Sequence, residues 1–440
     1  MAQGEPAEHL GEPLRWCTVE RYADGSQMKS SRYTLGLLLV IYVMNHVDRQ
    51  VMNILVEPVK GDLGISDSQV GLLIGGAFAL FYTVAGFPIA RLADKGNRRN
   101  IIVLALLAWS AMTVASGLAR NFGQLLAARI GVSVGEAGCT PPAHSMLSDA
   151  FPPEQRATAI SIYSLGVPIG TLFGLAFGGY LADELGWQAA FFAVGAPGIL
   201  LALLTRLTMT EPPRGTFDLG TDTNLPTLSE FLQFVGRNPS IRHMLAGSAV
   251  QTLFLAGAGT FHGSFLIRVH GFSLTEAGLA LGLIAGFAGG AAVMVAGALA
   301  DRLGERDLRW HWWIPALGAL LSVPFSVSAY LVEDGRLAIL LIAIATLGNH
   351  MYSGLGHAVL QGLVKPRMRA MTSATGLFVM NLVGFGIGPV LLGRLSDAFG
   401  GGTGVRSALI LLVGFLVWAS LHYALGARTY LHDLQAKKVS

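Results

Sequence analysis

The chain has 440 residues, of which 52% are hydrophobic and only 13% are charged, with a formal net charge of +3. Soluble domains carry about 25% charged residues. Together with a mean hydropathy of +0.54, this composition excludes an ordinary soluble enzyme, and the small net charge does not indicate nucleic-acid binding.

The apolar residues form twelve continuous runs, each long enough to cross a bilayer core of about 30 Å as a helix. Helices are expected because lipid offers the backbone no hydrogen-bond partners. A β-barrel would instead show short strands of alternating polarity. The twelve predicted spans are 33–56, 70–92, 100–119, 123–150, 157–182, 188–208, 241–267, 274–300, 311–332, 337–362, 370–396 and 405–430.

The connecting segments divide the predicted helices into two groups of six. Residues 1–32 are polar and lack the apolar core of a signal peptide, so we expect a cytoplasmic tail. A first bundle covers 33–208. Residues 209–240 form a cytoplasmic linker whose second part has the apolar spacing of an amphipathic helix on the membrane surface. A second bundle covers 241–430, and 431–440 form a cytoplasmic tail.

Most of the 30 Lys and Arg residues lie in the tails and in the connections that follow the even-numbered helices. Positively charged loops stay in the cytoplasm, so both termini are predicted inside. The short loops favour a bacterial inner membrane. The two cysteines, Cys17 and Cys139, give no disulfide framework. We expect a monomer, since twelve helices enclose a complete cavity.

The first helix holds two charged residues, Asp48 and Arg49, and the fourth holds Arg129 and Glu136. A charge at mid-membrane costs at least about 2.5–3.5 kcal/mol, so it normally faces protein or water. Asp48 and Arg49 point about 100° apart on a helix. Similar depths predict an Asp48–Arg129 pair. Contact between Arg49 and Glu136 is expected to need a long stretch, a water or a substrate between them.

These charges suggest a proton switch at Glu136 and Asp48, because the affinity of a buried carboxylate for protons depends on a nearby arginine. A static ion network between the helices is the alternative. Either arginine could bind an anionic head group through its forked donors. With a more apolar C-terminal half, the predicted substrate cavity comprises Arg49, Arg129, Asn45, Tyr42, Phe254 and Asn381.

A charged phrase occurs twice, at 90–99 and at 297–306, and both copies read small-x-Leu-Ala-Asp-basic. Two further pairs of phrases, 153–157 with 366–370 and 179–183 with 393–397, keep nearly the same offset. Such repeats indicate two copies of one bundle. We expect the charged phrases to form an intracellular gate, with simple topology signalling as the alternative. The predicted gate residues are Asp94, Arg98, Arg99, Arg156, Asp301, Arg302 and Arg369.

With these phrases the chain resembles the major facilitator superfamily, an all-α membrane fold of two pseudo-symmetric six-helix bundles. The glycine-rich fifth and eleventh helices contribute to the resemblance. Within that superfamily it looks like the Spinster group of lipid transporters, on the phrases 45–49, 129–137 and 148–152. The resemblance implies alternating access and proton-linked movement of an amphipathic substrate, such as a lysophospholipid or a phosphorylated sphingoid base.

Two alternatives stay open. One is a transporter of sugar acids or other small organic anions, and the other is a membrane sensor that binds its ligand without moving it. An ATP-driven pump is not expected, because the chain has no P-loop. An enzyme is not expected, because no nucleophile–base pair or metal motif stands out. No cofactor or metal is expected either, since no His, Cys and Asp spacing suits a metal. The expected partners are the bilayer, protons and a small amphipathic or anionic substrate.

Overall fold

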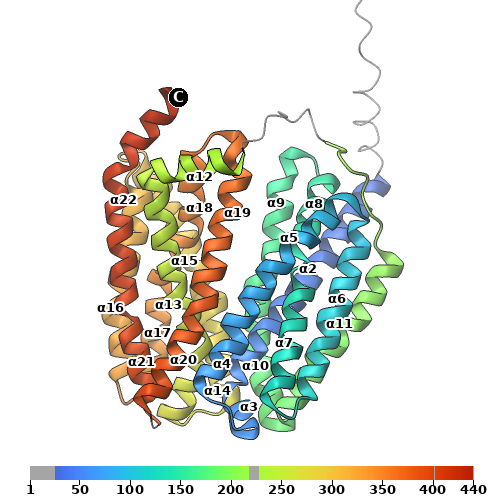
Figure 1. The fold of residues 1–440 in the computed structure, drawn as a ribbon, viewed down its shortest axis with the longest axis vertical. Coiled ribbons are helices and arrows are strands. Elements are labelled where there is room, and N and C mark those ends of the chain that lie inside the picture. Colours follow the sequence, from blue (N-terminus) through green and yellow to red (C-terminus); the bar gives the residue numbers. More distant parts are fainter. Residues whose placement is uncertain (1–24, 218–226, 401, 440) are drawn as a thin grey trace, which may run out of the picture.

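The computed structural model describes residues 25–217, 227–400 and 402–439. Within these ranges the chain is helical and contains no strand. Figure 1 shows two groups of helices standing side by side, α2 to α11 in one and α13 to α22 in the other. We call the end of the molecule where α12 lies the α12 end, and the opposite end, where α3 lies, the α3 end.

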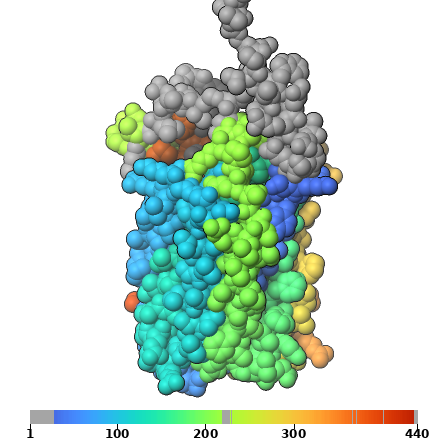
Figure 2. All heavy atoms as spheres, turned by 90° about the vertical axis from the view of Figure 1, so that its right-hand side faces the viewer, coloured from blue at the N-terminus to red at the C-terminus, as the bar shows by residue number. Residues whose placement is uncertain are grey.

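The N-terminal half begins with α2, which runs from the α12 end to the α3 end. Figure 2 shows that α6 and α11, which pack against each other, are neighbouring columns on the outer face of this half. Its helices are α2 Gly25–Ile54, α3 Val56–Leu63, α4 Asp67–Gly71, the π-helix η1 Leu72–Gly76, α5 Ala77–Lys95, α6 Arg98–Gly117, α7 Phe122–Glu136, α8 Thr140–Ala150, α9 Pro153–Ser164, α10 Gly166–Leu185 and α11 Trp187–Thr208.

The C-terminal half repeats this arrangement after the short helix α12 Leu228–Arg237. Its helices are α13 Pro239–His270, α14 Leu274–Leu283, the π-helix η2 Ile284–Ala288, α15 Gly289–Gly304, α16 Trp310–Leu331, α17 Gly335–His350, α18 Tyr352–Leu363, η3 Pro366–Met368, α19 Arg369–Val379, the π-helix η4 Met380–Phe385, α20 Gly386–Phe399, α21 Gly404–Leu412 and α22 Gly414–Val439.

In the described part of the chain, ten continuous helical segments are long and apolar enough to cross a membrane. The two remaining predicted spans are α2 and the pair α7–α8. They hold the four charges Asp48, Arg49, Arg129 and Glu136 that the sequence places inside membrane spans, and α7 ends early. These two spans complete the twelve-helix architecture that the sequence predicts.

The fourth span is not the single helix that 123–150 predicts. The backbone turns at residues 137–139, between α7 and α8. Proline lacks an N–H and its ring clashes with the carbonyl four residues earlier, so Pro141 and Pro142 disfavour a continuous helix here. They lie instead in the first turn of α8, where the missing N–H does no harm. The break places Glu136 at the last residue of α7.

Helix α12 packs on the C-terminal half. Phe231 is buried, and Phe234 and Val235 pack against the same core cluster, beside α13. Leu232 on the other side of α12 is exposed. A capping box between Thr227 and Glu230 satisfies the first N–H groups of this helix.

The joint between α10 and α2 depends on glycine. A Cβ at Gly170 would lie 2.5 Å from His46 Cβ and 2.6 Å from the carbonyl oxygen of Val43. We therefore expect Gly170→Ala to push α10 away from α2 and to cost about 1–3 kcal/mol of stability. Gly86→Ala is the matched control, because nothing lies within 4 Å of its Cβ position. Thermal unfolding in detergent measures both, and equal melting temperatures would contradict the prediction.

Candidate substrate cavity and gates

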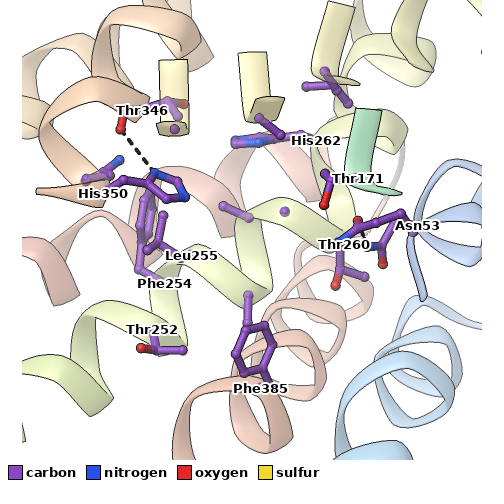
Figure 3. Close-up of a pocket in the computed structure, with 18 of the residues that line it drawn as sticks. Asn53, Thr171, Thr252, Phe254, Leu255, Thr260, His262, Thr346, His350 and Phe385 are labelled. Atoms are coloured by element: carbon purple, nitrogen blue, oxygen red, sulfur yellow. Dashed lines mark hydrogen bonds between the residues drawn. The ribbon is translucent and has the colours of Figure 1, made fainter. Parts of the chain in front are cut away.

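A cavity of about 580 Å³ lies between the two halves of the molecule, lined by residues of both. Asn53 and Thr171 come from the N-terminal half. Helix α13 supplies several of the residues that Figure 3 labels, namely Thr252, Phe254, Leu255, Thr260 and His262. Opposite them, His350 and Phe385 come from α17 and η4. The cavity therefore brings together side chains that are far apart in the sequence.

Four of the predicted cavity residues line this space: Arg49, Arg129, Phe254 and Asn381. Tyr42 and Asn45 are not among the lining side chains of the described residues. Tyr42 stacks on Tyr163 with ring centroids 4.3 Å apart, and Asn45 is buried. Both lie on α2 outside the cavity lining.

Arg49 and Glu136 form a direct ion pair in which Arg49 Nε donates to Glu136 Oε2. Of the three expected routes, a long stretch, a water or a substrate, the structure has the first, because the two side chains reach each other directly across the α2–α7 boundary. Glu136 is completely buried, whereas 28% of the Arg49 side chain is exposed. The ring of Tyr82 lies 4.7 Å from the Arg49 guanidinium, and that of Phe78 lies 5.2 Å away. Arg49 thus presents a charged, aromatic-flanked group to the cavity.

Asp48 and Arg129 form the pair that their depths predict. Arg129 Nη1 donates to Asp48 Oδ1 over 3.2 Å, and both side chains are 2% exposed. Thr113 Oγ1 donates to the other carboxylate oxygen of Asp48. The guanidinium of Arg129 lies 5.3 Å from the Phe78 ring, so Phe78 contacts both arginines. Two ion pairs of different exposure therefore stand side by side.

The C-terminal wall of the cavity carries polar groups without a formal charge pair. His350 Nδ1 donates to the carbonyl oxygen of Thr346, which leaves Nε2 as an acceptor (Figure 3). His262 Nε2 lies 2.8 Å from the hydroxyl of Tyr330. Phe254 and apolar residues complete this wall. The cavity is charged on one side and mostly apolar on the other.

The predicted gate residues lie at the α12 end, in several separate groups. Arg98 is almost fully buried and bonds Asp149, Glu211 and the carbonyl oxygen of Pro212, all of the N-terminal half and the segment that follows it. Arg99 donates to the carbonyl oxygen of Met209.

The other gate residues have different surroundings. Arg156 donates to the carbonyl oxygen of Ser148, and the carbonyl of Asp94 accepts from Arg214. Asp301, Arg302 and Arg369 are exposed.

A second network, at the α3 end, was missed by sequence reasoning. Arg268 Nη1 lies 2.6 Å from Asp67 Oδ2, and its Nη2 lies 2.7 Å from Glu57 Oε1. Lys60 Nζ also reaches Asp67, at 2.6 Å, and Ser396 Oγ donates to it. The network joins α3 and α4 of one half to α13 and α20 of the other. No local motif marks these residues, since they come from four separate segments.

Comparison with known proteins supports the fold and identifies the family. The family model described as Major Facilitator Superfamily matches residues 38–389. An MFS-type efflux pump of Mycolicibacterium smegmatis is 33% identical over 428 residues, covering 94% of this chain and 96% of the pump. The hexuronate transporter of Bacillus subtilis is 26% identical, covering 89% and 94%.

A solved structure is similar over almost the whole chain. It is a bacterial homologue of the human lysosomal transporter Spinster in an inward-facing, unoccupied conformation. The TM-score is 0.85 at 34% identity, and the match covers 92% of this chain and 98% of the other. The helical fold, the family match and these relatives lead to one conclusion. The chain is a multi-pass membrane protein that belongs to the Major Facilitator Superfamily of transporters.

Proposed function

We propose that this protein is a proton-coupled secondary transporter that moves an amphipathic, lipid-like anion by alternating access. A lysophospholipid or a phosphorylated sphingoid base is the proposed substrate class. The observation that carries the proposal is the asymmetry of the cavity, with Arg49 and Arg129 on one wall and Phe254 among apolar residues on the other. An arginine fork suits a phosphate, and the apolar wall suits an acyl or alkyl chain.

The exposure of the two ion pairs suggests how protons are coupled to transport. Arg49 faces the cavity while its partner Glu136 is buried behind it. Protonation of Glu136 would remove the ion pair and leave Arg49 free for an anionic head group. Asp48 and Arg129 form a second pair in the same wall, and Asp48 is the second proposed proton site. A change in the arginine contacts as the halves rock would then change the proton affinity of the carboxylates.

We assign the α12 end to the cytoplasm, because the basic connections of the chain lie there. Asp94, Arg98, Arg99, Arg156, Asp301, Arg302 and Arg369 then form the proposed intracellular gate. The network of Arg268 closes the opposite side in this conformation. A bacterial inner membrane is the proposed location, and a monomer is the proposed working unit.

A small organic anion is the second candidate substrate. The similarity to the hexuronate transporter favours it, and either arginine could hold a carboxylate as well as a phosphate. The apolar part of this wall distinguishes the two classes. A sugar acid could contact His350 and Thr346 but would leave Phe254 and Leu255 uncovered, whereas an acyl chain would cover them.

The test is a flux assay in sealed liposomes that contain the purified protein and a lumenal pH dye. Addition of a lysophospholipid or sphingoid phosphate is expected to change the lumenal pH, and protein-free liposomes are the control. A pH change with a labelled hexuronate but not with the lipids would favour the second candidate. Ligand binding without flux of any substrate would contradict transport and indicate a membrane sensor.

A further inference from the structure

We propose that Asp183 and Asp397 have equivalent roles in keeping the two halves together at the α3 end. Each accepts hydrogen bonds from the first turn of a helix of the opposite half. The proposal rests on alternating access as proposed above. It assigns a role to two acidic residues outside the cavity, and it explains why the phrases 179–183 and 393–397 repeat in the sequence.

The first joint lies between α20 and α4. Asp397, near the end of α20, accepts the N–H of Asp67 at 3.0 Å and the N–H of Ser68 at 2.8 Å, one on each carboxylate oxygen. The hydroxyl of Ser68 also donates to Asp397 Oδ2, at 2.5 Å. These N–H groups belong to the first turn of a helix, where the backbone has no acceptor of its own.

The second joint, between α10 and α14, has the same pattern atom for atom. Asp183, near the end of α10, accepts the N–H of Leu274 at 3.3 Å and the N–H of Thr275 at 2.7 Å, again one on each oxygen. The hydroxyl of Thr275 donates to Asp183 Oδ2 at 2.6 Å. Ser68 and Thr275 therefore occupy matching positions in the two halves.

Each capped helix also has its own capping box. Ser66 and Gln69 form one at α4, and Ser273 and Glu276 form one at α14. The box satisfies the N–H of the third residue, so the aspartate of the other half completes the turn. A carboxylate is well suited to this place because the N-terminus of a helix carries partial positive charge.

Glycines bring the helices close enough for these bonds. A Cβ at Gly393 would lie 2.2 Å from the carbonyl oxygen of Asp67, and one at Gly179 would lie 2.3 Å from that of Leu274. On the capped helices, a Cβ at Gly71 would lie 2.3 Å from the carbonyl oxygen of Pro389. The equivalent Gly278 would place its Cβ 2.2 Å from that of Leu175.

These joints connect opposite halves, so opening the α3 end must separate both of them. The two first turns would then exchange a fixed carboxylate for water. Because each aspartate contributes only while the α3 end is closed, its removal favours the opposite conformation. The two contributions should add in free energy, since the joints share no residue.

The experiment measures the separation of the halves by electron spin resonance, with labels at Arg120→Cys and Arg336→Cys. Both sites are exposed at the α3 end, one in each half. Cys17→Ser and Cys139→Ser remove the native thiols. Asp183→Asn and Asp397→Asn are each expected to raise the ratio of separated to closed molecules about tenfold, and the double variant about a hundredfold. Glu184→Gln and Glu333→Gln, which change exposed acids at the same end, are expected to leave the ratio unchanged.

Thr275→Val and Ser68→Ala remove only the hydroxyl donors, and they provide the test if an aspartate variant fails to fold. They should shift the ratio in the same direction by a smaller factor. An unchanged ratio in the folded aspartate variants, or in the hydroxyl variants should the aspartate variants misfold, would overturn the proposal, as would an equal shift in the controls. The measurement needs no substrate, so a failure of the lipid-transport proposal would leave its result intact.

Discussion

Glu136→Gln is expected to abolish pH-driven transport and to leave the protein folded. Glutamine cannot exchange a proton at working pH, and it removes the charge that holds Arg49 at the cavity wall. Folding should survive because 28% of the Arg49 side chain is exposed in the cavity, where water can solvate the unpaired guanidinium. The measurement is substrate-dependent lumenal pH in liposomes, beside the melting temperature of the purified variant.

The matched control is Glu305→Gln, a neutralised acid that is exposed at the α12 end. It should transport like the unmodified protein. If Glu136→Gln keeps an unchanged pH dependence, Glu136 is not the proton switch. Loss of transport together with loss of folding would instead favour the static ion network.

Arg129→Met is expected to lower the stability of the protein more than Glu136→Gln does. Asp48 and Arg129 are both 2% exposed, so removal of the arginine leaves a buried carboxylate whose remaining polar contact is Thr113. Breaking a buried pair from one side costs about 3–5 kcal/mol. Thermal unfolding of Arg129→Met in detergent should therefore show a large decrease, whereas Arg120→Met, in an exposed loop, should show almost none.

The double variant Asp48→Asn, Arg129→Gln removes both charges and should recover most of that stability, since two neutral polar groups can bond each other. A double variant no more stable than Arg129→Met would contradict this explanation. Its transport is equally informative. Retained pH-driven flux would make the Asp48–Arg129 pair structural, and lost flux in the folded variant would support Asp48 as a proton site.

Much of the fold could be predicted from the sequence because membrane helices are encoded locally. A run of about twenty apolar residues must become a helix in lipid, whatever surrounds it. The repeated phrases at 90–99 and 297–306 predict two related bundles for the same reason. The one predicted span that is not a single helix, 123–150, also has a local cause. Pro141 and Pro142 interrupt it at the turn after Glu136.

The candidate site could be predicted only in part. A charge within an apolar run can be recognised from the sequence alone, and this identifies Asp48, Arg49, Arg129 and Glu136. Their depths in the helices also predict the Asp48–Arg129 pair correctly. The direct contact of Arg49 with Glu136 depends on how α7 ends and how α2 packs beside it, and residue spacing contains neither. The same limit separates Tyr42 and Asn45, behind the wall, from Arg49 on its surface.

The membrane class of the protein, its helices and the charges within them follow from the amino-acid sequence alone, because the cost of polar groups in lipid acts on each segment separately. The contacts that join the two halves at the α3 end arise only in the folded molecule. Asp183 and Asp397 bond backbone N–H groups of the opposite half. Every residue except proline carries such an N–H, so the residue type does not reveal the contact. Arg268 likewise meets Asp67 and Glu57 only after the halves assemble. Contacts between distant segments arise from packing, and packing is a property of the folded chain.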